Sequence, residues 1–199
     1  MSDRRIVLAS RSPRRAALLA GAGWDVAVRT TAVDDGDLQD GAVPPAAWTT
    51  ALAWLKARAV WDMLWGTSEP SEALPIVAGD TVCEHGGVML GQPADAAEAA
   101  SMIHGMQGAS HAVWTGLCVL LPGKARRIGV DRAMVHVGEV PASEIEAYVA
   151  SGRWRGKAGG YNLSERIDAG WPITYDGHAS TIMGMPMPLL ERLIGDDLA

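Results

Sequence analysis

The chain has 199 residues, of which 48% are hydrophobic and 20% are charged, and its formal net charge is −6. This length suits one domain with a sizeable core, and the apolar fraction excludes a disordered chain. The negative charge argues against non-specific binding to nucleic acid or anionic lipid, because both are polyanions. No apolar run reaches the roughly 18 residues that a membrane span needs, so we expect neither nucleic acid nor a membrane as a partner.

Apolar periodicity predicts strands that alternate with helices along the chain. We predict strands at residues 6–9, 24–29, 75–78, 82–90 (a hairpin turning at Gly86–Gly87), 109–121 and 126–137. We predict helices at residues 13–22, 44–65, 94–104, 141–151 and 186–194, with Ser12 as the N-cap of the first. Strands interleaved with helices indicate an α/β fold with a mixed sheet.

The two cysteines, Cys83 and Cys118, stand singly in strand-like segments. Their spacing is not typical of a metal site, so we predict buried, reduced thiols. Reduced thiols favour a cytoplasmic protein, and the apolar stretch after the N-terminal arginines is too short for a secretory signal.

The first candidate site is the segment Ser-Arg-Ser-Pro-Arg-Arg at residues 10–15, after the first predicted strand. A helix start presents unpaired backbone N–H groups and the positive end of the helix dipole. Arg11, Arg14 and Arg15 add guanidinium groups whose geometry suits phosphate oxygens. The glycine-rich Walker pattern is absent, so a P-loop is not indicated. The alternative is a capped surface helix with solvated arginines.

Asp80 comes just after the predicted strand at residues 75–78. Because α/β folds place active sites at the carboxyl ends of strands, Asp80 is a candidate for holding a divalent cation, activating a water molecule, or both. Asp34 and Asp35, in an acidic segment, are candidates for the same cation. The alternatives are a turn-capping aspartate at position 80 and a solvated acidic loop.

Two lysines give weaker signals. Lys157 lies in a glycine-rich turn at residues 156–161, where an ammonium group and backbone donors together suit an anion. Lys56, near the middle of the long predicted helix, has the pattern of an ordinary exposed helical lysine.

An ordered set of motifs resembles the Maf family: LASRSPRR at residues 8–15, Lys-Ala at 56–57, AGDTV at 78–82, LGQP at 90–93, Thr-Gly at 115–116, YVASG at 148–152, GKAGGY at 156–161 and GMP at 184–186. The resemblance spans nearly the whole chain and implies one domain over residues 1–199. It implies an inosine-triphosphatase-like fold, an elongated mixed-sheet α/β domain with two lobes and a central cleft. It also implies a cytoplasmic enzyme and a homodimer.

The resemblance further implies a nucleoside triphosphate pyrophosphatase that acts with a divalent cation, Mg²⁺, Mn²⁺ or Co²⁺. Asp80 matches the catalytic acidic residue of the family, which is described as a proton acceptor. The residues that match its phosphate site are Ser10, Arg15, Lys56 and Lys157.

Four further positions bear on the substrate. Arg14 and Thr81 match the branch associated with dTTP and UTP rather than the 7-methyl-GTP branch. Two other predicted substrate-binding residues depart from the family pattern, because Gln92 replaces a lysine and Ser164 replaces a glutamine. A glutamate expected before the long helix is also missing from residues 41–47.

These features leave two hypotheses. The leading one is a metal-dependent pyrophosphatase acting on dTTP, UTP or a modified nucleotide. The second is a nucleotide-binding regulatory protein in which the lost donors have weakened or removed catalysis.

Overall fold

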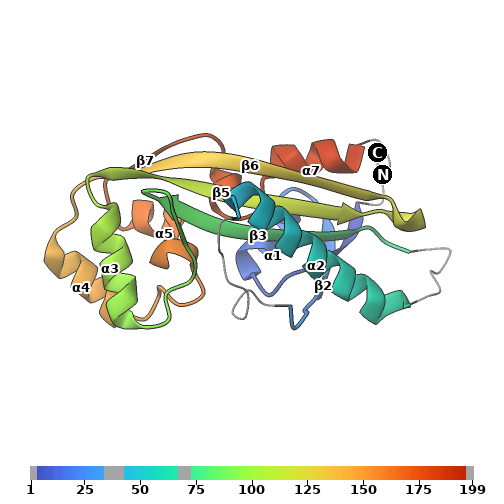
Figure 1. Cartoon of the computed structure of the whole chain (residues 1–199), viewed down its shortest axis with the longest axis horizontal. Coiled ribbons are helices and arrows are strands. Elements are labelled where there is room, and N and C mark those ends of the chain that lie inside the picture. Colours follow the sequence, from blue (N-terminus) through green and yellow to red (C-terminus); the bar gives the residue numbers. More distant parts are fainter. Residues whose placement is uncertain (1–3, 34–42, 67–72, 196–199) are drawn as a thin grey trace. The chain divides into compact units, whose positions relative to one another are not determined.

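A mixed β-sheet is the central element of the fold (Figure 1). The computed structural model describes residues 4–33, 43–66 and 73–195, and these contain seven strands in the order β2-β1-β3-β5-β6-β7, with β4 paired to β3. β1 is parallel to β2 and β3, whereas β4 is antiparallel to β3 and β7 to β6. The strands are β1 Arg5–Ala9, β2 Asp25–Arg29, β3 Ile76–His85, β4 Val88–Leu90, β5 Ala109–Leu120, β6 Arg126–Val137 and β7 Ile173–Asp176. The prediction of an α/β fold with a mixed sheet is confirmed.

The helices of the described residues are α1 Pro13–Gly21, α2 Pro45–Trp65, α3 Ala96–Met106, α4 Ala142–Ala150, α5 Leu163–Asp168, α6 Ala179–Ile182 and α7 Met187–Ile194. Each of the five predicted helices is present, with ends within two residues of the prediction. The prediction missed α5, α6 and β7, because segments of four to six residues show no periodicity. Among the helices that the structure describes, none is long and apolar enough to cross a membrane.

The strand that carries Asp80 is longer than predicted. It runs through Gly79 to His85, and then turns at Gly86 and Gly87, which have φ of 59° and 81° and connect it to β4 as predicted. Gly79 lies inside the strand rather than at its end. It allows close packing there, since a Cβ atom at this position would lie 3.1 Å from Leu117 Cδ2. The prediction that Asp80 follows the end of a strand is therefore wrong.

The chain divides into two compact units, in agreement with the two predicted lobes. The described part of the first unit comprises residues 4–33, 43–66, 73–80, 115–131 and 184–195, and the second comprises residues 81–114 and 132–183. The boundary falls inside β3, β5 and β6, so that Asp80 and Thr81 are consecutive residues of one strand in different units.

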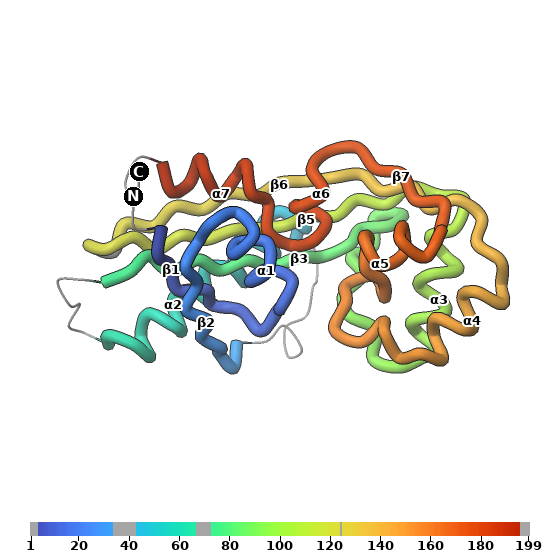
Figure 2. The backbone as a smooth tube through the Cα atoms, turned by 180° about the vertical axis from the view of Figure 1, so that it is seen from behind, coloured from blue at the N-terminus to red at the C-terminus, as the bar shows by residue number. Residues whose placement is uncertain are grey.

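In the first unit β1 is buried on both faces, as its continuous apolar run predicts. Ile6 and Leu8 pack with residues of α1 and α7, whereas Val7 and Ala9 pack with residues of α2 on the opposite face. α2 lies toward the viewer in Figure 1 and α1 in Figure 2, which shows the molecule from behind. Helices therefore cover both faces of β1, the strand that precedes the turn at residues 10–12.

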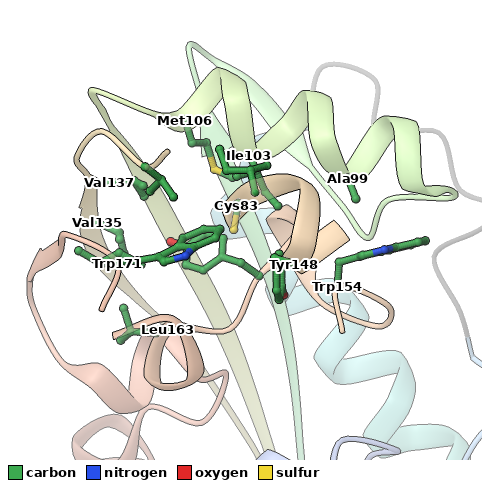
Figure 3. Packing of buried hydrophobic residues seen from close by; sticks show 14 of the residues in the cluster. Cys83, Ala99, Ile103, Met106, Val135, Val137, Tyr148, Trp154, Leu163 and Trp171 are labelled. Atoms are coloured by element: carbon green, nitrogen blue, oxygen red, sulfur yellow. The ribbon is translucent and has the colours of Figure 1, made fainter. Parts of the chain in front are cut away.

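The second unit has one hydrophobic core, drawn in Figure 3. It joins Cys83 of β3 and Val135 of β6 to Ile103 of α3. Tyr148 of α4 lies edge to face with Trp171, with ring centroids 5.5 Å apart. Trp and Tyr take the aromatic core positions of a chain that has no Phe. Both cysteines of the chain are buried and free, as predicted.

Candidate active site

The hydroxyl group of Ser10 organises the turn after β1. Ser10 is 7% exposed, and its Oγ accepts hydrogen bonds from the backbone N–H of Ser12 at 3.1 Å and from Nη1 of Arg15 at 3.2 Å. Ser12 occupies the N-cap position as predicted, but its side chain makes no capping hydrogen bond. Ser10 therefore links the end of the strand to the first turn of α1.

Arg15 carries a half-buried positive charge. Its Nε donates a hydrogen bond to the carbonyl oxygen of Gly184 at 2.7 Å. Burial lowers the pKa of Arg15, the nearby Asp80 acts in the opposite direction, and Arg14 lowers it further. The group still keeps its charge, because arginine stays protonated in proteins. The alternative of solvated arginines is wrong for Arg15, because its side chain is half-buried and bonds to Ser10 and Gly184.

Lys56 and Asp80 form an ion pair within the first unit. Thr49 and Lys56 lie seven residues apart, so they share one face of α2. That face packs tightly on the sheet, since a Cβ atom at Gly116 would lie 2.5 Å from the carbonyl carbon of Thr49. Nζ of Lys56 donates a hydrogen bond to Oδ1 of Asp80, and the two side chains are 18% and 8% exposed. The expectation of an exposed helical lysine at position 56 is wrong, because the sequence does not reveal which helix face meets the sheet.

The second carboxylate oxygen of Asp80 is unusual. Oδ2 is buried and has no hydrogen-bond partner within the part of the chain that the structure describes. Leaving a buried acceptor unpaired costs free energy, so such groups in native proteins call for an explanation such as a bound ligand. The alternative of a turn-capping aspartate is wrong, because Asp80 lies inside β3 and bonds to Lys56.

Lys157 carries a buried ammonium group, in the second unit. It is 7% exposed, and its Nζ bonds to Oε2 of Glu165 at 2.7 Å. The turn after it needs glycine, because Gly159 has φ of 69° and a Cβ atom there would lie 2.9 Å from Cys83 Sγ. The glycine-rich segment that follows Lys157 therefore packs closely against β3.

Two buried tyrosines hold the same turn. Tyr148 donates a hydrogen bond from its hydroxyl to the carbonyl oxygen of Gly160 at 3.1 Å, and the hydroxyl of Tyr161 lies 2.8 Å from Nε2 of His111. Burial, with a smaller contribution from His85, lowers the pKa of His111 to about 4. His111 is therefore neutral at pH 7. No sequence pattern indicates this pair, because the five histidines lie far apart along the chain.

The other predicted substrate-binding residues of the second unit lie nearer the surface. Thr81 is half-buried in β3, and Gln92 is exposed in the loop after β4. Ser164 is exposed, and its Oγ donates a hydrogen bond to Oδ1 of Asn162 at 2.9 Å. The structure thus brings Ser10, Arg15, Lys56 and Asp80 into hydrogen bonds or electrostatic contact within the first unit, and it describes Thr81, Gln92, Lys157 and Ser164 in the second.

Two partners of these charges, Glu165 and Gly184, are not among the predicted site residues, although Gly184 belongs to the GMP motif. Glu165 lies eight residues after Lys157, and this separation does not predict a contact unless the position of α5 is known. Gly184 binds Arg15 through its backbone carbonyl, and a backbone group leaves no signature in the residue type.

The predicted cation ligands are Asp80, Asp34 and Asp35, and the last two lie outside the described residues. Within residues 4–33, 43–66 and 73–195, no group of three or more His, Cys, Asp or Glu side chains could hold a metal ion. The free Oδ2 of Asp80 still fits a cation, because Mg²⁺ in phosphate-processing sites is bound by one or two carboxylates together with the substrate phosphates.

The sequence of this chain is similar to those of several known proteins. A dTTP/UTP pyrophosphatase of Rhizobium meliloti is 35% identical over 195 residues, which cover 97% of this chain and 93% of that protein. A nucleoside triphosphate pyrophosphatase of Streptomyces coelicolor is 36% identical over 195 residues, which cover 97% of this chain and 90% of that protein. Among solved structures, the Ham1 protein of Staphylococcus aureus matches with a TM-score of 0.41 and 14% identity, over 67% of this chain and 71% of that chain. The family model described as Maf-like protein matches residues 5–196, and this chain therefore belongs to the Maf-like family.

Proposed function

We propose that this protein is a nucleoside triphosphate pyrophosphatase, a hydrolase that cuts a nucleoside triphosphate into the monophosphate and pyrophosphate. The observation that carries the proposal is the buried carboxylate of Asp80, which has one oxygen bonded to Lys56 and the other without a partner among the described residues. A carboxylate held in this way is oriented to accept a proton. The names of the Rhizobium meliloti and Streptomyces coelicolor relatives support the same reaction.

The charges around Asp80 support a polyanionic substrate. Arg15 and Lys56 place two cationic groups in the same unit as Asp80, and the start of α1 adds backbone N–H groups. Preorganised cations of this kind stabilise the negative charge that spreads over the phosphoryl oxygens in the transition state. Lys157 remains a predicted phosphate ligand on the strength of the GKAGGY motif.

The chemical step follows from these roles. The oxygen of a water molecule forms a bond to the α-phosphorus, and Oδ2 of Asp80 takes a proton from that water. The bond between the α-phosphorus and its bridging oxygen breaks, and pyrophosphate leaves with the electron pair. Lys56 keeps the carboxylate in place through Oδ1, so the proton acceptor is positioned before the substrate arrives.

We also propose that a divalent cation, Mg²⁺, Mn²⁺ or Co²⁺, takes part. One lone pair of Asp80 Oδ2 would bind the cation, which leaves the other for the proton of the attacking water, and Asp34 and Asp35 are further predicted ligands. When bound, such a cation neutralises phosphate charge and polarises the phosphoryl oxygens.

The base preference that we propose is a pyrimidine, as in dTTP or UTP. The support is the pair Arg14 and Thr81 in the motifs, together with the names of relatives such as the dTTP/UTP pyrophosphatase of Rhizobium meliloti. The resemblance also supports a cytoplasmic homodimer, and light scattering of the purified chain would measure the oligomeric state.

The experiment is an assay of pyrophosphate release from dTTP, UTP, CTP, GTP and 7-methyl-GTP with each of the three cations. Asp80→Asn is the test variant, and Asp25→Asn, an exposed aspartate paired with Arg5 in the same unit, is the matched control. We expect turnover by the wild type and the control, with dTTP and UTP preferred, and none by Asp80→Asn. Nucleotide binding without pyrophosphate release by the wild type would instead establish the regulatory protein.

A further inference from the structure

The first unit has a pocket that the proposed reaction does not use. It has a volume of about 230 Å³ and is lined by Trp54, Arg58, Trp61, Gly66, Leu120 and Arg126; we call it the Trp–Arg pocket. Its walls come from the second half of α2, the residue after α2, the end of β5 and the start of β6. Its volume is below the roughly 300–1,000 Å³ typical of ligand sites, so it suits a molecule of one or two rings.

The Trp–Arg pocket lies on a different face of α2 from the candidate active site. Trp54, Arg58 and Trp61 follow the spacing i, i+4 and i+7, so they share one face of the helix. Lys56, which faces Asp80, is two residues from both Trp54 and Arg58, and two residues correspond to about 200° around a helix. A ligand in the pocket would therefore contact none of the residues that hold Asp80.

The floor of the pocket is apolar and packs closely against neighbouring side chains. Trp61 is 3% exposed and Leu120 is 4% exposed. The ring of Trp61 packs against Trp65 in an edge-to-face arrangement, with ring centroids 4.6 Å apart. Because so little of either side chain faces water, most of the apolar surface that a planar ring could cover belongs to the half-buried Trp54.

Among the described residues that line the pocket, the charges do not balance. Arg58 is neutralised, because its Nε lies 2.9 and 2.8 Å from the two carboxylate oxygens of Asp62. Arg126 has no carboxylate partner in the part of the chain that the structure describes, and its guanidinium group instead lies over the ring of Trp54, 4.7 Å from the centroid. The stacking fixes the arginine beside the apolar floor and leaves its N–H donors available for an anion.

We propose that the Trp–Arg pocket binds a small aromatic carboxylate, with its ring against Trp54, Trp61 and Leu120 and its carboxylate on Arg126. The positive charge of Arg126, which has no carboxylate partner among residues 4–33, 43–66 and 73–195, selects a monoanion over a neutral or cationic ring. The apolar floor selects an aromatic body over an aliphatic one of the same charge.

The test uses 2-naphthoate as the probe and the indole N–H signals of the ¹⁵N-labelled protein as the readout. The variants Trp54→Phe and Trp61→Phe assign the two signals of the pocket among those of the eight tryptophans. 2-Naphthalenemethanol is the neutral comparison, and cyclohexanecarboxylate is the aliphatic one. Arg126→Gln removes the charge. Its matched control is Arg132→Gln, because Arg132 stacks on Trp114 at 5.1 Å and Trp114 does not line the pocket.

We expect 2-naphthoate to shift the signals of Trp54 and Trp61 saturably, with the affinity reduced about tenfold or more by Arg126→Gln and unchanged by Arg132→Gln. Arg126→Lys, which keeps the charge, should retain part of the affinity, and unchanged signals of the other tryptophans would show that the variants are folded. The proposal is overturned if these two signals do not saturate, if the neutral or aliphatic probe binds as well, or if Arg126→Gln binds normally. None of these outcomes depends on the proposed pyrophosphatase activity.

Discussion

The two units each contain a lysine paired with a carboxylate, and the pairs differ in which partner is buried. In the first unit, the side chain of Asp80 is 8% exposed and that of Lys56 18%. In the second unit, the side chain of Lys157 is 9% exposed and that of Glu165 40%. The first pair therefore protects a carboxylate from water, and the second protects an ammonium group.

This difference predicts which substitution is costly in each pair. Removing the more exposed partner leaves a buried charge without compensation, whereas removing the buried charge leaves a partner that water can solvate. Lys56 and Glu165 should thus contribute more to stability than Asp80 and Lys157 do, and Lys56 also takes part in the proposed chemistry. Four predictions test or sharpen this division.

The largest effect should come from Asp80→Asn. We expect kcat for pyrophosphate release to fall by about 10²–10⁴, because amide nitrogen and oxygen cannot take the proton of the attacking water. The free energy of unfolding should change little, since the amide oxygen still accepts the hydrogen bond of Lys56. Steady-state kinetics and urea unfolding of the same preparation measure both quantities. A variant that keeps its turnover, or that loses turnover only by unfolding, contradicts the assignment.

Lys56→Met should have the next largest effect. It leaves the buried Asp80 carboxylate unpaired, and we expect the free energy of unfolding to fall by about 3 kcal/mol. The double variant Lys56→Met/Asp80→Asn should recover part of this loss, because the uncompensated charge is gone. Urea unfolding at pH 7 measures both. An equal loss in the single and double variants would show that packing of the lysine stem, rather than charge, stabilises the site.

The third prediction concerns His111, which is buried and neutral rather than charged, and its effect on stability as pH changes. The pKa of His111 is about 4 in the folded protein, below its ordinary value of 6.5. Between these values the unfolded chain binds a proton that the folded protein does not, so stability falls as pH decreases from 6.5 towards 4. We expect a loss of about 2–3 kcal/mol between pH 7 and pH 4.5 from this residue.

The variant His111→Gln isolates that contribution, because glutamine does not titrate and still offers a hydrogen bond to Tyr161. The difference in unfolding free energy between wild type and variant should shrink between pH 7 and pH 4.5. A difference that stays constant with pH would mean that His111 does not titrate on unfolding as expected.

The smallest effect should come from the second pair. Glu165→Gln leaves Lys157 buried without its counter-charge, and we expect a loss of about 1–2 kcal/mol in unfolding free energy. Lys157→Met leaves a glutamate that water solvates, so its cost should stay below about 1 kcal/mol. Thermal unfolding of both variants ranks them. The reverse order would remove the distinction between the two pairs.

Much of the fold could be predicted because its elements are long and periodic. β1 reads as a continuous apolar run, and α2 extends from Pro45 to Trp65 between clear signals. The short segments α5, α6 and β7 could not be predicted, since they are held by partners distant in sequence. β6, for example, provides the hydrogen-bond partners of β7.

The sequence predicts which residues belong to the candidate site, but it does not predict how they are arranged. Asp80 was singled out for a position at a strand end that it does not occupy. Its contact with Lys56 depends on how closely α2 packs on β5, and Gly116 sets that distance through the absence of a side chain. A local pattern contains no information on such a contact between segments.

The order in which the two units occur along the chain has a consequence for synthesis. The core of the first unit joins Ile6 and Leu8 of β1 to Met185, Leu189 and Leu190, yet residues 81–114 and 132–183 of the second unit are translated between them. At about 5–20 residues per second, the ribosome needs on the order of ten seconds or more to reach α7 after β1 has been made. During that time the Ile6 and Leu8 face of β1 lacks this part of its cover. A nascent chain arrested before residue 184 should therefore expose this face to chaperones, and release of α7 completes the first unit only after every residue of the second has been added.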